Sequence, residues 1–418
     1  VDGIILGEST VSGTYDITAA GGTVTDDGTL AITGVTTISA SSHVTLDLAT
    51  NNFVAAVGIT GANVEVRDVG EIVLGPSTVS GTYTVTAGDA ITNTSTLDIT
   101  GITTINAIGK NVSLNYASND FKNEVRITGA DVAVTDIGDI KLGASTVSGT
   151  YVVTAGSSVT DEGTLLITGA TTINASGQNV TLDHPSNNFI GTVGIIGADV
   201  EVVDVNTLVL GLSTVSGTYE ATATAGNITQ SLVTGNRLSI SGTTTLQTSA
   251  EAATIDLSNT NNGFTGALLI TTNDNTDGAD GVYAADVTID GGTTKLNIGT
   301  STIDGDLTLT GGHTADAEGI KDTGTVTVKG NLTVTNDVSN GDIDMGQLAV
   351  DGTIALVTSG SGGDVTVVND AGLSFANATV GGDFAATATT GNIIQTGEMD
   401  INGTTTITAT ASGANVTL

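Results

Sequence analysis

The sequence predicts an all-β chain folded as a parallel β-solenoid, and three observations support this prediction. The heptapeptide STVSGTY begins at Ser9, Ser77, Ser145 and Ser213, so successive copies are 68 residues apart. Glycine accounts for 57 of the 418 residues, whereas aromatic residues make up 3% and proline occurs twice. Short runs of valine, isoleucine and threonine alternate with polar residues and are bounded by Gly, Asn and Asp. Such a regular repeat of short strands is typical of one structural unit stacked on copies of itself.

The 68-residue repeat divides into shorter segments that each open with an aliphatic residue. One set of steps runs from Ile91 to Val112, from Val112 to Val132, and from Val132 to Val159, and the last step is the longest. Each step is interpreted as one coil, which gives about three coils per repeat. Val112 is therefore expected to lie beside Val132 in the next coil. The valines expected to be buried at this position are Val112, Val132, Val180 and Val200.

The repeats divide the chain into two regions. Residues 1–219 hold the regular 68-residue repeats, and residues 220–418 continue the same solenoid with degenerate copies. In the second region, TATAGNITQ at Thr222 returns as TATTGNIIQ at Thr387. The opening VDGIILG resembles VGEIVLG at Val69, so the chain is expected to be a segment of a longer protein.

The charge balance excludes several classes of partner. Forty-four acidic residues against nine basic residues give a net charge of −35. Nucleic acids and anionic membrane surfaces are recognised by basic patches, so neither is an expected partner. No apolar run approaches the roughly 20 residues of a membrane-spanning helix, so this segment is not expected to insert into a membrane. A long chain without cysteine favours a bacterial exported protein over a disulfide scaffold.

No catalytic residue and no cofactor other than calcium are expected, and the chain is not expected to be an enzyme. Solenoid enzymes that cleave polysaccharides gather carboxylates with arginine or lysine on one face, whereas the basic residues here are dispersed from Arg67 to Lys329. The histidines His43, His184 and His313 lie in turns or variable loops without recurring partners. Acid–base and zinc sites need converging side chains, and no repeat supplies them.

The recurring aromatic residues allow two interpretations. They could form an exposed binding stripe, or they could cover the edge of a thin core. The second is favoured, because copies on neighbouring repeats would be roughly 14 Å apart if each repeat had three coils. The residues concerned are Tyr15, Tyr83, Tyr151, Tyr219, Phe53, Phe121 and Phe189.

The repeat vocabulary resembles a known group of proteins. STVSGTYVVTAG, GATTINASGQNVTLD and NNFIGTVGIIGADVEVVDVNTLVLG are similar to the β-strand repeats of giant bacterial exoproteins. These are the filamentous haemagglutinin-like adhesins of two-partner secretion and related autotransporter passengers. The resemblance implies a right-handed parallel β-helix, export to the bacterial cell surface, and a shaft that presents a distal adhesive tip. No ligand-binding motif is carried over.

Two functions of different class follow. The first is the structural shaft of a large secreted surface adhesin, with a host or neighbouring-cell surface as its partner. The alternative is a self-assembling extracellular filament, sheath or surface-layer protein, whose partners are copies of itself. Stacked repeats serve both functions, because stacking supplies length and the lateral faces supply contacts.

One local motif predicts a calcium site. NDNTDGADG places oxygen-bearing side chains on a short turn: Asn273, Asp274, Asn275, Asp277 and Asp280. Asn273, Asn275 and Asp277 alternate and precede Gly278, which resembles the first half of an EF-hand loop. The twelfth position is Ala284, so the bidentate glutamate of that loop is missing. A solvated loop without metal is the alternative.

Overall fold

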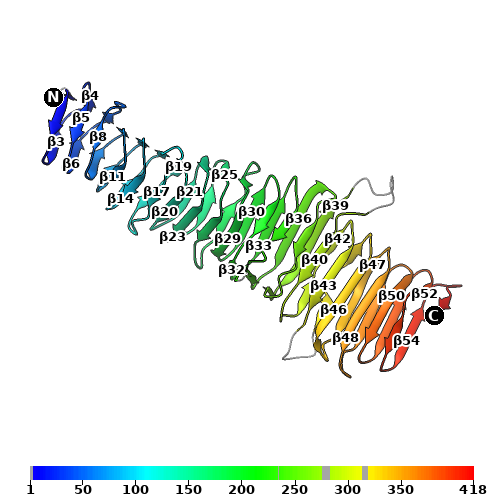
Figure 1. Ribbon diagram of the computed structural model, residues 1–418. Coiled ribbons are helices and arrows are strands. Elements are labelled where there is room, and N and C mark those ends of the chain that lie inside the picture. Colours follow the sequence, from blue (N-terminus) through cyan, green and yellow to red (C-terminus); the bar gives the residue numbers. More distant parts are fainter. Residues whose placement is uncertain (1–2, 234, 275–282, 313–318) are drawn as a thin grey trace. The chain divides into compact units, whose positions relative to one another are not determined.

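A computed structural model describes residues 3–233, 235–274, 283–312 and 319–418. Over these residues the regular structure consists of strands that pair in parallel, as Figure 1 shows. The described part of the chain contains no helix long and apolar enough to cross a membrane. The predicted all-β parallel solenoid is confirmed. The chain separates into two compact units, residues 1–198 and 199–418, which are described in turn.

The first unit has two main sheets and one small sheet. Sheet 1 contains β1 (Ile4–Leu6), β4 (Val24–Asp26), β7 (Val44–Leu46), β10 (Val64–Asp68), β13 (Tyr83–Ala87), β16 (Thr103–Asn106), β19 (Glu124–Gly129), β21 (Ile140–Leu142), β22 (Ser145–Val147), β24 (Val159–Asp161), β25 (Leu165–Ile167), β27 (Val180–Leu182) and β28 (Asn188–Phe189). Sheet 2 contains β3 (Tyr15–Ala19), β6 (Thr36–Ala40), β9 (Val57–Gly61), β11 (Ile72–Leu74), β12 (Ser77–Val79), β14 (Ile91–Asn93), β15 (Leu97–Ile99), β17 (Val112–Leu114), β18 (Asp120–Phe121), β20 (Val132–Asp136), β23 (Tyr151–Ala155), β26 (Thr171–Asn174) and β29 (Thr192–Gly197). The small sheet contains β2 (Ser9–Val11), β5 (Leu30–Ile32) and β8 (Asn52–Phe53).

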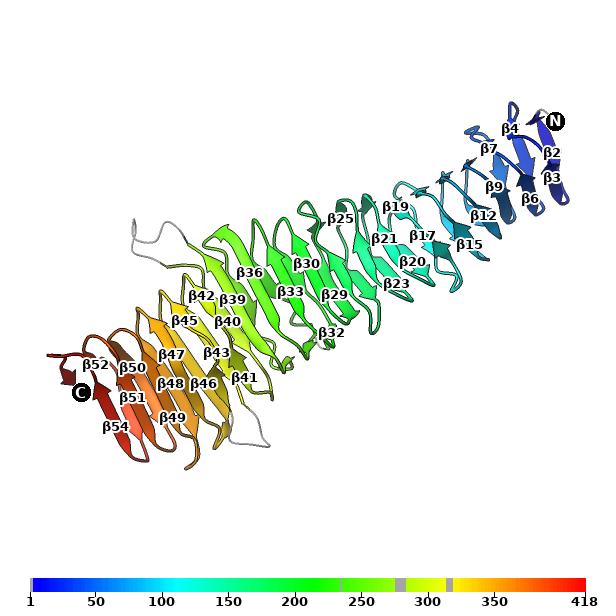
Figure 2. The ribbon, with the colours of Figure 1, turned by 180° about the vertical axis from the view of Figure 1, so that it is seen from behind.

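Each turn of this unit combines one longer strand with a bent pair of short strands. In the second repeat the longer strands β10, β13, β16 and β19 lie in sheet 1, and the bent pairs lie in sheet 2. The roles of the sheets then exchange, because β19 in sheet 1 is followed directly by the longer strand β20 in sheet 2. Figure 2 shows the same strands from behind.

The strand register gives three and a half turns per repeat. On sheet 1 each strand pairs with the strand one turn further on, in the order β7, β10, β13, β16, β19, β21, β24 and β27. The seven pairings between these eight strands correspond to seven turns. These turns lead from Val44 to Val180, which are two repeats apart, at about 19 residues per turn. Val112 lies one repeat after Val44 and belongs to sheet 2. Successive repeats therefore present the same motif on opposite sheets.

The register confirms part of the coil assignment and corrects part of it. Val112 pairs with Val132, as expected, and Ile91 pairs with Val112. The third expected step is wrong, because Val132 pairs with Tyr151, whereas Val159 lies in the other sheet. The segment that includes STVSGTY is not an extension of one long coil, because its tyrosine begins the longer strand of a new turn.

The core is thin and mostly aliphatic, with a few buried aromatic rings. Inward positions alternate with outward ones along the longer strands, so that Val132 and Val134 are buried and Ala133 is partly exposed. The four valines predicted to be buried are 0% to 3% exposed. Each such side chain contributes roughly 1.5–3 kcal/mol when fully buried, so stacked rows of them stabilise the solenoid.

The second unit is also built from two parallel sheets. Sheet 3 contains β30 (Val200–Asp204), β33 (Tyr219–Ala223), β36 (Thr244–Glu251), β39 (Ala267–Asn273), β41 (Leu296–Ile298), β42 (Ser301–Ile303), β44 (Ile320–Asp322), β45 (Val326–Val328), β47 (Ile343–Val350), β49 (Val365–Asn369), β51 (Phe384–Ala388) and β54 (Thr405–Ala409). Sheet 4 contains β31 (Leu208–Leu210), β32 (Ser213–Val215), β34 (Ile228–Gln230), β35 (Leu238–Ile240), β37 (Ile255–Leu257), β38 (Gly263–Phe264), β40 (Val287–Asp290), β43 (Leu307–Gly311), β46 (Leu332–Ser339), β48 (Ile354–Ser359), β50 (Leu373–Val380), β52 (Ile393–Gln395), β53 (Met399–Ile401) and β55 (Val416–Thr417).

Turns of the second unit are longer and less regular. Tyr219 pairs with Thr244, and Thr244 pairs with Leu268, whereas the equivalent Tyr83 of the first unit already pairs with Thr103. The longest strands of this unit have 8 residues, and their pairings contain register shifts, for example between Gln247 and Glu251. Extra residues are accommodated as such shifts, which bend the strand locally.

Candidate functional sites

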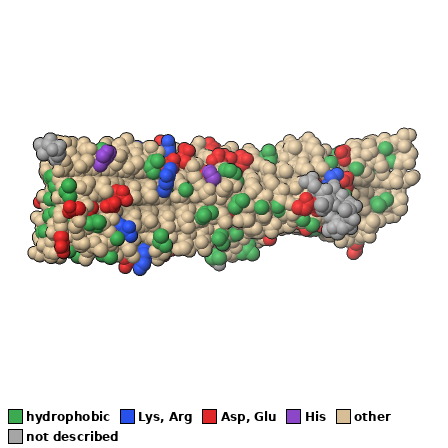
Figure 3. Space-filling model, turned by 90° about the horizontal axis from the view of Figure 1, so that it is seen from above, with side chains coloured by type: hydrophobic (Ala, Val, Ile, Leu, Met, Phe, Trp, Pro, Cys, Tyr) green, Lys and Arg blue, Asp and Glu red, His purple; other side chains and the backbone are tan. Residues whose placement is uncertain are grey.

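Charged side chains of the described residues form small groups on the surface. On the face seen in Figure 3, uncharged polar side chains and backbone make up most of the area, and charged side chains form small separate groups. One group brings like charges together, because Asp98 pairs in register with Asp120. The Lys122 ammonium bridges them, with Nζ 2.6 Å from an Asp98 oxygen and 3.4 Å from an Asp120 oxygen. All three side chains are well exposed, so this group contributes little to stability.

The predicted calcium site is only partly visible. Asn275, Asp277 and Asp280 lie outside the described residues. Asn273 ends β39 and donates from Nδ2 to the Ser249 carbonyl at 3.1 Å. Asp274 is 4% exposed and accepts a hydrogen bond from the Ala284 backbone N–H at 2.9 Å. The Asp274 side chain thus links the residues on either side of the predicted calcium loop. Calcium binding stays a prediction.

No metal-binding cluster appears elsewhere in the described ranges. Over those residues, three or more His, Asp or Glu side chains never converge in a way that could hold an ion. Acidic side chains at the corners instead accept backbone hydrogen bonds from the next coil. Asp131, for example, accepts from the N–H and the hydroxyl of Thr150, both at 2.9 Å.

The repeated heptapeptide has a structural role. Ser77, its first residue, is 3% exposed; its hydroxyl donates to the Gly75 carbonyl at 3.2 Å and accepts from the Ile59 N–H at 3.1 Å. Gly81 is required because a Cβ there would lie 3.0 Å from the Ala62 carbonyl oxygen and 2.0 Å from Asn63 Oδ1. Ser145 repeats the serine contacts on the opposite sheet. The motif therefore joins neighbouring turns.

The tyrosines of the motif are core residues. Tyr83, Tyr151 and Tyr219 are 0% exposed. Burial raises the pKa of the Tyr83 phenol well above its usual range, and the nearby Ser77 side chain lowers it by less. The Tyr83 hydroxyl has no hydrogen-bond partner among the described residues. These rings cannot form an exposed binding stripe, so the core interpretation is the correct one for these three. Tyr15 is partly exposed.

A buried polar bracket lies just before the recurring phenylalanines Phe53, Phe121, Phe189 and Phe264, and sequence reasoning missed it. Asn119 is 0% exposed; its Oδ1 accepts from the Leu97 N–H at 3.1 Å and from Asn93 Nδ2 at 2.7 Å. In other repeats the partner side chain is Asp or Gln instead. The equivalent side-chain pairs are Asp26 with Asn51, Asp161 with Asn187, and Gln230 with Asn262. The signal was present in the sequence as the asparagine two residues before the phenylalanine, namely Asn51, Asn119, Asn187 and Asn262.

A buried aspartate accompanies the bracket in the first unit. Asp136 is 2% exposed and accepts from the Phe121 N–H at 2.7 Å and the Gly138 N–H at 2.6 Å. Burial raises the pKa of Asp136 to about 6, while the two N–H donors oppose the rise. Asp68 makes the same two contacts, to Phe53 and Gly70, and its pKa is raised by the same cause. Both carboxyls therefore hold backbone N–H groups in place.

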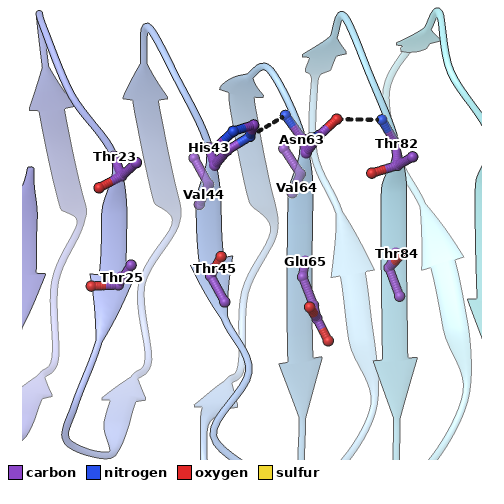
Figure 4. A pocket seen from close by; sticks show the side chains of 10 residues that line it. All are labelled: Thr23, Thr25, His43, Val44, Thr45, Asn63, Val64, Glu65, Thr82 and Thr84. Carbon is purple, nitrogen blue, oxygen red and sulfur yellow. Dashed lines mark hydrogen bonds between the residues drawn. The ribbon is translucent and has the colours of Figure 1, made fainter.

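A shallow depression lies on the outer face of sheet 1 (Figure 4). Its volume is about 330 Å³, and its lining residues are Thr23, Thr25, His43, Val44, Thr45, Asn63, Val64, Glu65, Thr82 and Thr84. His43 Nδ1 accepts a hydrogen bond from the Asn63 N–H at 3.3 Å. One repeat later, Asn111 Oδ1 accepts the equivalent bond from the Asp131 N–H, so the histidine ring replaces an asparagine side chain. Among the hydroxyl groups that line the depression stand one carboxylate, Glu65, and one imidazole, His43. The depression offers hydrogen-bond donors and acceptors to a ligand.

Comparison with known proteins agrees with the 68-residue period. The model of the family described as repeats of unknown function (DUF5649) matches residues 1–60, 61–128, 129–196, 197–271 and 362–418. Two of these matches span one 68-residue period each. No curated protein sequence and no solved structure matches the chain. Since the matches cover most of its length, the chain belongs to the DUF5649 repeat family.

Proposed function

We propose that the chain is a structural shaft segment of a large secreted bacterial surface adhesin and that it presents a distal binding region. One observation carries the proposal: along the longer strands the buried residues recur among the repeats, whereas several of the outward residues change. Tyr83, Tyr151 and Tyr219 are buried alike. The outward residues that follow them are a threonine, a valine and a glutamate. Repeats that keep their scaffold and vary their surface fit a spacer better than a ligand-binding array.

The geometry of the repeats also favours a spacer. Two repeats add seven turns, and parallel strands are about 4.8 Å apart, so each pair of repeats lengthens the first unit by about 34 Å. Length can therefore be adjusted by whole repeats without a new core. An acidic chain without cysteine suits export and residence at the bacterial surface. The partner of the proposed shaft is then the target cell of its distal region, and the shaft itself is not an enzyme.

The test is an in-frame deletion of residues 61–196 from the protein on the cell surface. Deleting two repeats removes seven whole turns, so the strands beyond the junction keep their sheet assignment. We expect normal export and normal target binding, with the distal region about 34 Å closer to the cell by super-resolution distance measurement. Loss of target binding with normal surface display would contradict the shaft.

A second measurement addresses the alternative of a self-assembling filament or sheath. The purified chain is expected to remain monomeric in sedimentation and to form no fibres under the electron microscope. Ordered fibres or sheets would overturn the shaft proposal and support the filament. The deletion of residues 61–196 supplies a second comparison. In a filament-forming protein it should impair assembly, whereas in a shaft it should only shorten the distance between the distal region and the cell.

A further inference from the structure

A groove lies in the second unit where successive turns pass a corner through glycine. Its volume is about 560 Å³. Gly330 donates its N–H to the Gly305 carbonyl at 3.0 Å, and Gly352 donates to the Gly330 carbonyl at 3.1 Å. A Cβ on Gly352 would lie 2.2 Å from that Gly330 oxygen, so a side chain cannot occupy this floor. The corner is a backbone shelf open to a flat ligand.

Polar side chains border the shelf on both sides of the glycine row. Lys329 and Asp351 each precede a glycine, and Lys329 Nζ lies 3.0 Å from Asp351 Oδ2. Asp306 and Asn331 each follow a glycine, and Asp306 Oδ1 accepts from the Asn331 N–H at 2.6 Å and from Asn331 Nδ2 at 3.1 Å. Both rows line the groove.

The bordering groups keep hydrogen-bonding capacity. Within the part of the chain that the structure describes, Asp306 Oδ2 and Asp351 Oδ1 make no hydrogen bond. Lys329 has three N–H donors, of which the bond to Asp351 uses one. That bond is also the main cause that raises the pKa of Lys329, so the ammonium stays charged. The groove is therefore bordered by acceptor oxygens of Asp306 and Asp351 and by the cationic donor Lys329.

An aromatic ring completes the groove. Tyr283 is partly exposed and lines the groove beside the glycine shelf. Accessible aromatic rings are scarce in this chain, because all six phenylalanines and three of the six tyrosines are buried. An accessible tyrosine can offer an apolar face and a polar hydroxyl to the same ligand.

We propose that this groove binds a hexose unit of a neutral polysaccharide. The C–H face of the sugar ring packs on Tyr283, and adjacent hydroxyls donate to Asp306 Oδ2 and Asp351 Oδ1 while one accepts from Lys329 Nζ. Two carboxylates against one ammonium repel an acidic sugar, so uronic acid chains are excluded. The site lies on the solenoid wall, and the proposal does not depend on the shaft function.

The test is a titration of the full chain with three hexasaccharides: maltohexaose, cellohexaose and hexagalacturonate. At least one of the neutral sugars is expected to bind saturably in calorimetry at or below about 10 mM, and hexagalacturonate is not. Tyr283→Ala is expected to weaken that binding about tenfold or more, and Asp306→Asn combined with Asp351→Asn to weaken it further.

The matched control is Tyr116→Ala, which removes another accessible tyrosine, 41% exposed, in the first unit. This variant is expected to bind like the parent chain. Absence of saturable binding by both neutral hexasaccharides would overturn the proposal, as would equal binding by Tyr283→Ala and the parent chain. Circular dichroism of each variant distinguishes lost binding from lost fold, and Tyr283→Phe, which keeps the ring, is expected to retain most of the affinity.

Discussion

The second and third repeats have closely similar sequences but lie on opposite sheets. Residues 61–128 begin with β10 in sheet 1, and residues 129–196 begin their long strands with β20 in sheet 2. Their inward residues are the same or closely similar, whereas several outward residues of the longer strands differ. Thr84 follows the tyrosine in one repeat and Val152 in the other. Because each repeat ends half a turn out of phase, its interior must fit either sheet, and the inward residues of the longer strands vary less than the outward ones.

The largest expected effect comes from the buried tyrosine. Tyr151→Ala should lower the free energy of unfolding of its unit by about 3–5 kcal/mol, because a fully buried aromatic side chain leaves a cavity. Tyr83→Ala should cost about the same, since the two rings occupy equivalent places on opposite sheets. Urea unfolding followed by circular dichroism measures both. A marked difference between the two variants would show that the sheets are not interchangeable.

The three and a half turns per repeat explain which features the sequence could predict and which it could not. The period, the parallel strands and the burial of Val112 follow from residue spacing alone. The turn length does not, because Tyr151 and Val159 both open a strand with an apolar residue, and the sequence cannot tell which of them stacks on Val132. The sequence did not predict the buried hydrogen bonds of Asn119, because polar residues at strand ends are normally exposed.

The groove at Tyr283 was beyond the reach of the sequence for another reason. Its lining residues come from different turns of the second unit, where the period is irregular. Asp306 and Asp351 are far apart in the sequence, and no repeat places the same pair elsewhere. The predicted metal loop, by contrast, was a contiguous motif, and contiguous motifs are what sequence patterns detect most readily.

A smaller effect is expected from the polar bracket. Asn119→Ala leaves the buried Leu97 N–H without its acceptor and should cost about 1–3 kcal/mol of unfolding free energy. Asn123→Ala is the matched control, because Asn123 is exposed and accepts only from its neighbour Glu124, at 2.8 Å. Its loss should stay within about 0.5 kcal/mol. Equal losses in the two variants would argue against a structural role for the bracket.

The buried aspartate gives a pH-dependent effect. Asp136 has a folded pKa of about 6, above the unfolded value of about 4, so the folded chain holds a proton that the unfolded chain releases. Its contribution to stability is therefore complete below about pH 4 and is lost as the pH rises through about 6. The melting temperature of the parent chain relative to Asp136→Asn should fall between about pH 4 and about pH 7.

Asp131 supplies the control of opposite sign. Hydrogen bonds from the Thr150 backbone and side chain hold the pKa of this exposed carboxyl below its usual range. Its contribution is present above the unfolded pKa of about 4 and is lost as the pH falls through the lower folded value. Asp131→Asn should therefore change the relative melting temperature only on the acidic side. Parallel pH curves for the two variants would refute the burial of Asp136.

The smallest effect is expected from exchanging the outward residues of the two repeats. Thr84→Val combined with Val152→Thr gives each sheet the surface residue of the other repeat, and both residue types have high strand propensity. The free energy of unfolding should change by less than about 0.5 kcal/mol, because neither side chain packs in the core. The neighbouring inward residues need no exchange, since Val85 and Val153 are already identical. A loss above about 1 kcal/mol in the outward exchange would mean that the surface is fitted to its own sheet, and the repeats could then not vary freely outside a constant core.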